Sequence, residues 1–328
     1  MNKFKILFID IFFVISGIVG VGFVTGKEIS HYFVAGKSVI VASIIFGIVF
    51  VILSWFILHI KHRFNICNLT SLNKFAFGRY YEIGDMVLTL VMVVTSSAML
   101  AGCDNLVNNY LNIHFPLVSV ILSIITFVVM FGGIRRVRKI ASVMTPIIII
   151  MIIINALSNS NAGASQVGNL GIDFAFPIVF ACHNFVTLIA VLFNCKSKPS
   201  TLSLVSAILL TTIILISSFA LVGVDGDMPM LALSKGMGNV FFVLYLWCVV
   251  CALFTTLQIS TYSCWQVLSK PKTNRAFTLM LVIITSQIIA NLGFDFIVRY
   301  LYFGIGIFSA IYLIMIIISL IIQIRKFK

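Results

Sequence analysis

Two adjacent threonines and a histidine–asparagine pair are polar residues inside apolar runs of this 328-residue chain. Thr255 and Thr256 offer two hydroxyl oxygens, the kind of ligand that a hard cation such as sodium prefers. His183 and Asn184 lie at mid-run, where an ionisable side chain is a functional candidate, and imidazole can carry a proton near neutral pH. The structural alternatives are a threonine that bonds its own helix and a neutral histidine that bonds a neighbouring helix.

A glycine-rich segment at 16–28, S-G-I-V-G-V-G-F-V-T-G-K-E, lies within the first apolar run. Glycine weakens a helix because it has the most backbone freedom to lose. In a bilayer, loosened backbone survives only where protein buries it or where it lines a wet cavity. The segment therefore predicts an interrupted helix whose N–H groups at Gly20, Val21 and Gly22 suit an anionic group. Alternatively, Gly22-x-x-x-Gly26 is a small-residue contact between helices.

The composition indicates which elements position these groups. The chain is 61% hydrophobic and 9% charged, with a mean hydropathy of +1.17, unlike any soluble globular domain. Apolar runs of bilayer-spanning length recur along it. They predict an all-α polytopic membrane protein with ten helices, at 4–34, 38–60, 83–108, 115–133, 139–157, 171–194, 200–222, 236–264, 275–293 and 298–324.

The net charge of +13 is explained by membrane topology. In the ten-helix arrangement, the lysines and arginines gather in the termini and loops of one side, and the exceptions are Lys27, Lys37, Lys235 and Arg299. This bias places both termini in the cytoplasm, and the expected location is the bacterial cytoplasmic membrane. Because the charge is spread over short loops, no nucleic-acid partner is expected. The basic, aromatic loop 61–82 predicts a short helix on the membrane surface.

An uncharged Ser/Asn/Gly-rich loop at 158–170 divides the helices five and five. We predict a single transmembrane domain of two inverted repeats, 1–157 and 171–328. In such transporters, interrupted segments at matching positions of the two halves mark the binding site. The glycine segment interrupts the first helix of one half, and Pro177 is expected to interrupt the first helix of the other.

Residues 20–33, G-V-G-F-V-T-G-K-E-I-S-H-Y-F, resemble the first-helix motif of the YkvI-type bacterial membrane proteins, roughly G-A-G-F-A-S-G-x-E-I-x-x-F-F. The matching positions are Gly20, Gly22, Phe23, Gly26, Glu28, Ile29 and Phe33. That family is similar to the amino acid–polyamine–organocation superfamily, whose members share the LeuT fold. The resemblance implies that helices 1 and 6 unwind at mid-membrane and hold the substrate.

The resemblance also implies a sodium ion between helices 1 and 8. Its ligands would be the carbonyls of Ser16 and Val19 and the hydroxyls of Thr255 and Thr256. In sodium-independent relatives of the superfamily, a lysine on helix 5 can replace the ion. No lysine occurs between 142 and 155 here, which favours a cation. No cofactor other than this sodium ion is expected.

The expected substrate site surrounds the unwound segments, with a small-molecule solute as partner. Its candidate residues are Gly20, Val21, Gly22, Thr25, Ser96, Phe180, His183, Asn184 and Gln258. Ser96 is alternatively a small packing residue. Glu28 is expected to pair with a cation or to belong to an outer gate, while Lys27 reaches the interface. Asp10 is expected to pair with the basic inner turns or to be a proton site.

These features predict a secondary active transporter of a small, amino-acid-like solute, coupled to sodium or protons, with alternating access to a mid-membrane site. The alternative is a solute-sensing membrane receptor of the same fold without net transport. An intramembrane enzyme is not expected, because the sequence contains no catalytic motif with the residue spacing that such an enzyme requires. The chain also lacks the phosphate-binding G-x-x-x-x-G-K-[ST] motif of an ATP-driven pump. The oligomeric state is not predicted.

Overall fold

The computed structural model describes residues 3–34, 38–111, 117–159, 174–269 and 274–326, and every regular element in them is a helix. The predicted all-α class is therefore confirmed. The elements are α1 (Lys3–Ser16), α2 (Val21–Val24), α3 (Lys27–Ile29), η1 (Ser30–Val34), α4 (Val39–Phe64), α5 (Leu69–Phe77), η2 (Gly78–Tyr80), α6 (Tyr81–Leu111), α7 (Leu117–Met130), α8 (Gly133–Ser158), α9 (Ala175–Asn194), α10 (Pro199–Leu221), α11 (Pro229–Lys235), α12 (Asn239–Leu268), α13 (Arg275–Ala290), α14 (Phe294–Phe296), η4 (Ile297–Leu301) and α15 (Tyr302–Lys326).

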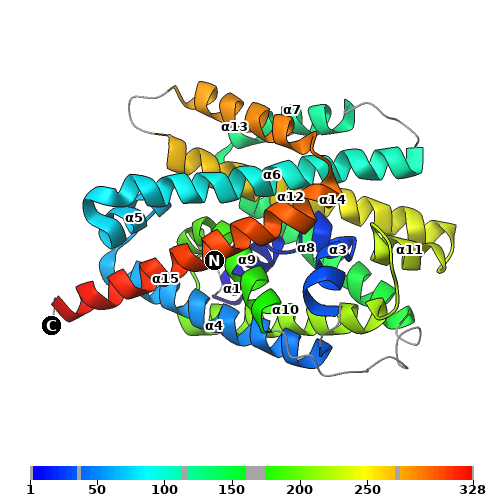
Figure 1. Ribbon diagram of the computed structural model, residues 1–328, viewed down its shortest axis with the longest axis horizontal. Helices are drawn as coiled ribbons and strands as arrows, with labels where there is room; N and C mark the ends of the chain where they lie inside the picture. The colour runs from blue at the N-terminus through cyan, green and yellow to red at the C-terminus, as the bar shows by residue number, and fades with distance from the viewer. Residues whose placement is uncertain (1–2, 35–37, 112–116, 160–173, 270–273, 327–328) are drawn as a thin grey trace.

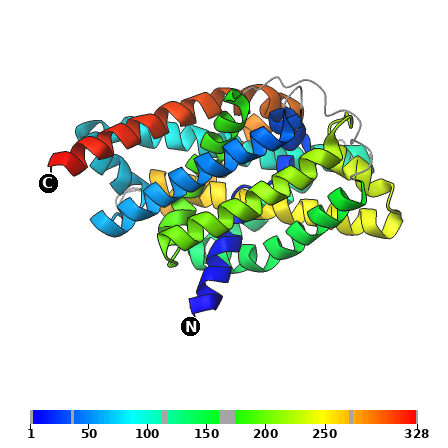
Figure 2. The ribbon, with the colours of Figure 1, turned by 90° about the horizontal axis from the view of Figure 1, so that it is seen from below.

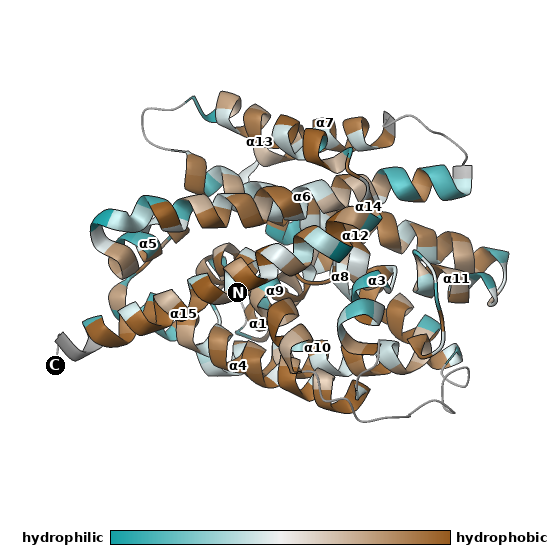
Figure 3. Cartoon of the chain, in the orientation of Figure 1, coloured by the Kyte–Doolittle hydropathy of each residue, from teal (hydrophilic) through white to brown (hydrophobic). Residues whose placement is uncertain are grey.

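Among the described residues, seven helices are long and apolar enough to cross a membrane, and two shorter apolar helices lie in α7 and α13. With the interrupted first segment, α1 to η1, they account for the ten predicted segments. Large apolar side chains at Ile44, Ile48 and Ile52 are exposed along one face of α4, at the four-residue spacing of a helix surface. Hydrophobic ribbon accordingly covers much of the periphery in Figure 3. The multi-pass membrane architecture is confirmed.

The helix packing repeats between the two halves of the chain. In the first half α1 packs on α8, and in the second half α9 packs on α15 in the same way. Counterparts also pair across the halves: α6 packs on α12, and α4 runs beside α10 (Figure 2). The short helices α5 and α11 each follow the second spanning helix of a half, and they lie at opposite ends of the bundle (Figure 1). This is the predicted 5+5 inverted arrangement.

The repeat boundaries 1–157 and 171–328 stay a prediction, and most of the loop 158–170 lies outside the described residues. The short helix predicted within 61–82 is present as α5, and its place on the membrane surface stays a prediction. It begins with a capping box in which Asn68 accepts from the backbone of Ser71 at 2.7 Å. Such reciprocal bonds satisfy two free N–H groups of the first turn. Helix α11 was not predicted, because seven residues are too few for a periodic pattern.

The two predicted interruptions have different outcomes. The first segment is broken between α1 and α2, as expected. The expected interruption of helix 6 is corrected by the structure, because α9 is continuous from Ala175 to Asn194. Pro177 is the third residue of α9, within the first turn, where a missing N–H has no helical partner to lose. Only one side of the candidate site is therefore unwound backbone.

Candidate functional site

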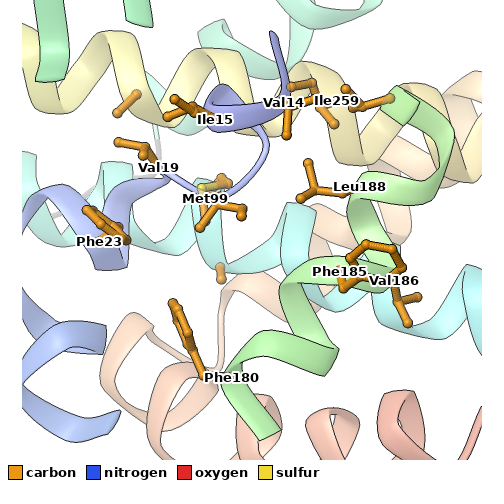
Figure 4. Close-up of a cluster of buried hydrophobic side chains, with 14 of the residues drawn as sticks. Val14, Ile15, Val19, Phe23, Met99, Phe180, Phe185, Val186, Leu188 and Ile259 are labelled. Atoms are coloured by element: carbon orange, nitrogen blue, oxygen red, sulfur yellow. The ribbon is translucent and has the colours of Figure 1, made fainter. Parts of the chain in front are cut away.

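The backbone leaves the helical path between Ser16 and Val21 (Figure 4). Gly20 is extended, with φ −92° and ψ −167°, and its N–H donates to the carbonyl of Ile18 at 2.8 Å. In a continuous helix this N–H would serve the carbonyl of Ser16. That carbonyl instead accepts the hydroxyl of Thr256 in α12, at 3.1 Å. The break therefore turns a backbone oxygen of the first segment toward α12.

Glycines in this segment allow close approach by neighbouring side chains. A Cβ at Gly17 would lie 2.3 Å from Cδ2 of Leu188 in α9, and one at Gly22 would lie 2.3 Å from Oε1 of Glu28. Gly26 adopts φ 83°, the left-handed region that glycine tolerates without strain. Gly22 thus faces the Glu28 carboxylate of its own segment. This face of Gly22 is therefore not a small-residue contact with another helix.

The residues expected to bind sodium are only partly brought together. Thr256 and the carbonyl of Ser16 are in direct contact. The hydroxyl of Thr255 donates to the carbonyl of Ala252 in its own helix, at 3.1 Å, as threonines in helices commonly do. Val19 is buried within the break. The contacting pair consists of a hydroxyl and a carbonyl oxygen, and these donors fit a hard cation.

A group of buried polar side chains lies where α3, η1, α9 and α15 approach one another. Glu28 is 4% exposed, and Tyr32 and Tyr302 lie within electrostatic range of it. The ring of Tyr302 lies 4.5 Å from that of His183, and the ring of Tyr32 lies 5.1 Å from that of Phe180. The hydroxyl of Tyr302 and Nδ1 of His183 are buried without a hydrogen-bond partner among the described residues. Such atoms are uncommon in folded proteins.

Two residues expected at the substrate site contact other helices. Ser96 in α6 donates to Ser260 in α12 at 2.9 Å, which matches the packing alternative. Gln258 donates to Thr126 in α7 at 3.4 Å. Gln258 lies two residues beyond Thr256, which is about 200° around the helix. Its amide nitrogen therefore faces α7, and its place in a substrate site stays a prediction.

Two further candidates bond to their own helices. Asn184 donates to the carbonyl of Phe180 at 3.0 Å, and Thr25 donates to that of Val21 at 2.7 Å. Asn184 and Thr25 are both buried. Phe180 does reach the expected region, because Figure 4 shows its ring extending from α9 toward the break.

Met99 and Tyr302 were not predicted from the sequence. A Cβ at Gly20 would lie 3.2 Å from Cε of Met99, which Figure 4 shows beside the break. A methionine in an apolar helix and a tyrosine in an aromatic run carry no distinguishing pattern. Their positions follow from how α6 and α15 are rotated against the first segment, which spacing alone does not specify.

Ion pairs join three elements at one end of the bundle. The ammonium of Lys27 lies 3.0 Å from a carboxylate oxygen of Asp227, which precedes α11, and 2.8 Å from one of Asp295 in α14. Arg299 lies 3.4 Å from the same Asp295 oxygen. Lys27 thus forms the ion pairs at this end of the bundle, whereas Glu28 turns into the protein.

Two polar cavities flank these ion pairs, with Asp227 in the lining of both. One, of about 330 Å³, includes Lys27, Asp225 and Arg299 in its lining. The other, of about 470 Å³, is lined by carboxylates and amides together with small and apolar residues. Its polar lining residues are Asp104, Asn105, Asn108, Asn109, Asp227 and Asn291.

Asp10 is fully buried toward the opposite end of the bundle and holds three elements together. One carboxylate oxygen accepts from the guanidinium of Arg138 in α8. The other accepts from the N–H of Lys196 at 2.8 Å, and from the N–H and hydroxyl of Ser197 at 2.9 and 2.7 Å. Pairing with a basic inner turn, one of the two alternatives from the sequence, is the arrangement observed.

Comparison with known proteins identifies the fold of the chain. No family model matches the sequence, and no curated protein matches it. Among solved structures, the chain resembles Mhp1, a nucleobase-cation-symport-1 family transporter, in a closed conformation with bromovinylhydantoin bound: 18% identity, 94% of this chain, 76% of Mhp1, TM-score 0.67. An inward-facing Mhp1 structure matches at 17% identity, 94% and 75% coverage, and TM-score 0.66.

A substrate-bound, outward-open Na+-coupled sialic acid symporter matches with 13% identity and a TM-score of 0.67. The match covers 95% of this chain and 78% of the symporter. Identities at this level speak for the fold and not for the substrate. The chain is an all-α membrane protein with the LeuT fold, as the resemblance implied.

Proposed function

We propose that this protein is a secondary active transporter of a small solute, coupled to sodium or protons. The observation that carries the proposal is a broken first segment with buried ionisable groups beside it and a polar closure toward each end. The Lys27 ion pairs lie toward one end, and the Asp10 network lies toward the other. The fold shared with symporters supports the same conclusion.

Alternating access would require the two closures to open in turn. Outward opening separates α3 from the loop before α11 and from α14, which the Lys27 ion pairs join. Inward opening separates α1 from α8 and from the loop at Lys196–Ser197, which Asp10 joins. A solute can drive these changes only by binding one state more tightly than the other.

The amino-acid-like class of the solute, the bacterial cytoplasmic membrane, the cytoplasmic termini and the YkvI-type kinship stay predictions. The positive-inside distribution of lysine and arginine supports the orientation. The arrangement of the chain agrees with it, because Lys61 at the end of α4 donates to the carbonyl of Cys195 after α9 at 2.5 Å. The expected topology places both of these positions on the cytoplasmic side.

Uptake into liposomes tests the function directly. We expect the purified, reconstituted full chain to accumulate at least one radiolabelled amino acid when a sodium or proton gradient is imposed. Abolishing the gradient with an ionophore should return uptake to the level of empty liposomes. Saturable binding of the same amino acids without accumulation would instead support the sensing receptor and contradict transport.

Replacing Thr256 with valine should weaken sodium dependence. The change keeps the side-chain shape but removes the oxygen that contacts the carbonyl of Ser16. Loss of one oxygen ligand is expected to raise the sodium concentration for half-maximal uptake about tenfold or more. Thr255→Val is the matched control, because the Thr255 hydroxyl bonds only its own helix in the described contacts. Unchanged sodium dependence in Thr256→Val would contradict this assignment.

A further inference from the structure

The Glu28 side chain identifies a chemical class of solute, an inference that rests on the proposed transport function. We propose that the Glu28 carboxylate binds the cationic amino group of the solute, with the rings of Tyr32, Phe180 and Tyr302 around it. Organic ammonium groups are recognised by a carboxylate combined with aromatic faces. The position, charge and surroundings of Glu28 each support this assignment.

The position of Glu28 places the carboxylate inside the protein. Glu28 lies on α3, and its side chain folds back against Gly22 of α2. A Cβ at Gly22 would lie 2.3 Å from Oε1, 2.4 Å from Cδ and 2.5 Å from Cγ of Glu28. Lys27, the preceding residue, points instead to Asp227 and Asp295 at the outer ion pairs. Lys27 therefore belongs to the ion pairs at the end of the bundle, whereas Glu28 belongs to the interior.

A negative charge on Glu28 would not be balanced by the described part of the protein. In the described part of the chain, no lysine, arginine or histidine forms an ion pair with Glu28. The nearest basic residue in sequence, Lys27, is held by two other carboxylates. A carboxylate that is 4% exposed is costly to bury unless a positive group or a proton compensates it. A solute ammonium would supply that charge when it binds.

The surroundings of Glu28 suit an organic cation better than a bare metal ion. Glu28 lies in electrostatic range of the tyrosines at 32 and 302, and Tyr32 contacts Phe180. Aromatic faces attract ammonium groups, whereas sodium needs a shell of oxygens. The unpartnered hydroxyl of Tyr302 and Nδ1 of His183 provide two polar atoms for hydrogen bonds to the solute. The sodium candidates at Ser16 and Thr256 form a separate contact.

One of the two cavities beside the Lys27 ion pairs is also suited to cations. The cavity of about 470 Å³ has Asp104 and Asp227 in its described lining, with four asparagines and no lysine or arginine. One oxygen of Asp104 is buried without a hydrogen-bond partner in the described residues. Clefts lined by charge of one sign raise the local concentration of the opposite charge. A cationic solute would therefore meet acidic side chains both on entry and at Glu28.

Paired solutes test the inference on the purified full chain in detergent. Each pair differs only in the amino group: an amino acid with the 2-hydroxy acid of the same side chain, and butylamine with butanol. We expect the amino member of at least one pair to raise the melting temperature of the wild type more than its partner does. In Glu28→Gln the apparent affinity for that amine should fall about 10- to 100-fold, because a charge-assisted bond is lost.

Two further variants make the result specific. Asp225→Asn removes an exposed carboxylate near the outer ion pairs and should leave the amine response unchanged. Glu28→Asp keeps the charge but shortens its reach, so it should bind the amine more tightly than Glu28→Gln does. Size-exclusion profiles and melting temperatures without solute should establish that the Glu28 variants fold as the wild type does.

Several outcomes would overturn the inference. Hydroxy and amino members that act equally, or an amine response that survives Glu28→Gln, would do so. A sodium-induced shift that Glu28→Gln removes, while the amine response persists, would assign the carboxylate to the ion instead. The uptake assay separates the two proposals: amine binding without flux contradicts transport only. Flux of a solute without an amino group, unaffected by Glu28→Gln, contradicts this inference only.

Discussion

Asp10→Asn is expected to destabilise the protein strongly, because a single buried carboxylate joins α1 to α8 and to the loop after α9. One oxygen of Asp10 accepts from Arg138, and the other accepts three bonds from Lys196 and Ser197. An amide nitrogen cannot accept any of them, so the variant leaves either the guanidinium or the three donors without a partner. Removing one member of a buried ion pair costs about 3–5 kcal/mol.

Thermal unfolding of the detergent-solubilised variant checks this expectation. The melting temperature should fall by on the order of 5 °C or more. Asp295→Asn is the matched control, because Asp295 pairs with Lys27 and Arg299 but its side chain is 42% exposed. Exposed pairs contribute only about 0–1 kcal/mol. Equal losses in the two variants would contradict the structural role of the Asp10 network.

Gly22→Ala is expected to lower uptake strongly while changing stability little. The added methyl group would overlap the Glu28 carboxylate, which lies 2.3 Å from its position. To make room, the Glu28 side chain must turn aside from Cγ outward, because Cδ and Cγ also lie within about 2.5 Å of that position. Alanine also favours the helical backbone of α2 by about 0.5–1 kcal/mol. Displacing a binding group by about 1 Å can reduce rates about 100-fold.

Uptake kinetics and melting temperature, measured together, check this expectation. We expect the uptake rate at low solute concentration to fall between about 10- and 100-fold, with a melting temperature close to that of the wild type. Gly304→Ala is the matched control, because no atom lies within 4 Å of its Cβ position. It should transport normally. Full uptake by Gly22→Ala would show that the position of Glu28 against Gly22 is not needed for transport.

Local sequence effects accounted for the spanning segments and for the break in the first one. Long apolar runs form helices in a bilayer because no other partner exists for their backbone groups. The glycines of 17–22 weaken one of these helices wherever it lies, so the interruption could be predicted without knowing the neighbours. The basic loops, read with the positive-inside rule, supported an even number of segments.

The break predicted at Pro177 is absent because of where the helix begins. A proline disrupts a helix interior but is tolerated in the first turn. Whether Pro177 is interior depends on where α9 begins, and helix boundaries cannot be read accurately from one sequence. Since α9 begins at Ala175, the proline falls in the first turn and the helix continues.

Which candidate residues reach the site depends on how each helix is rotated about its own axis. Thr255 and Thr256 are adjacent, yet they point about 100° apart on α12, and only Thr256 reaches the carbonyl of Ser16. The same rotation turns Gln258 toward α7. The sequence identifies hydroxyl and amide residues in a uniformly apolar helix as candidates. Their spacing does not determine which neighbouring helix each side chain faces.

The amino-acid sequence was enough to establish a multi-pass helical membrane protein, its two-part order and the weak point in its first helix. These properties depend on hydrophobicity, charge and backbone freedom, which belong to individual residues and short segments. The packing of the helices established that Glu28 turns inward against Gly22. It also established that Lys27 pairs with Asp227 and Asp295 at one end of the bundle, and that Asp10 joins three elements toward the other. Those relations join residues distant in the sequence, 200 positions apart in the case of Lys27 and Asp227, and they exist only once the helices pack together.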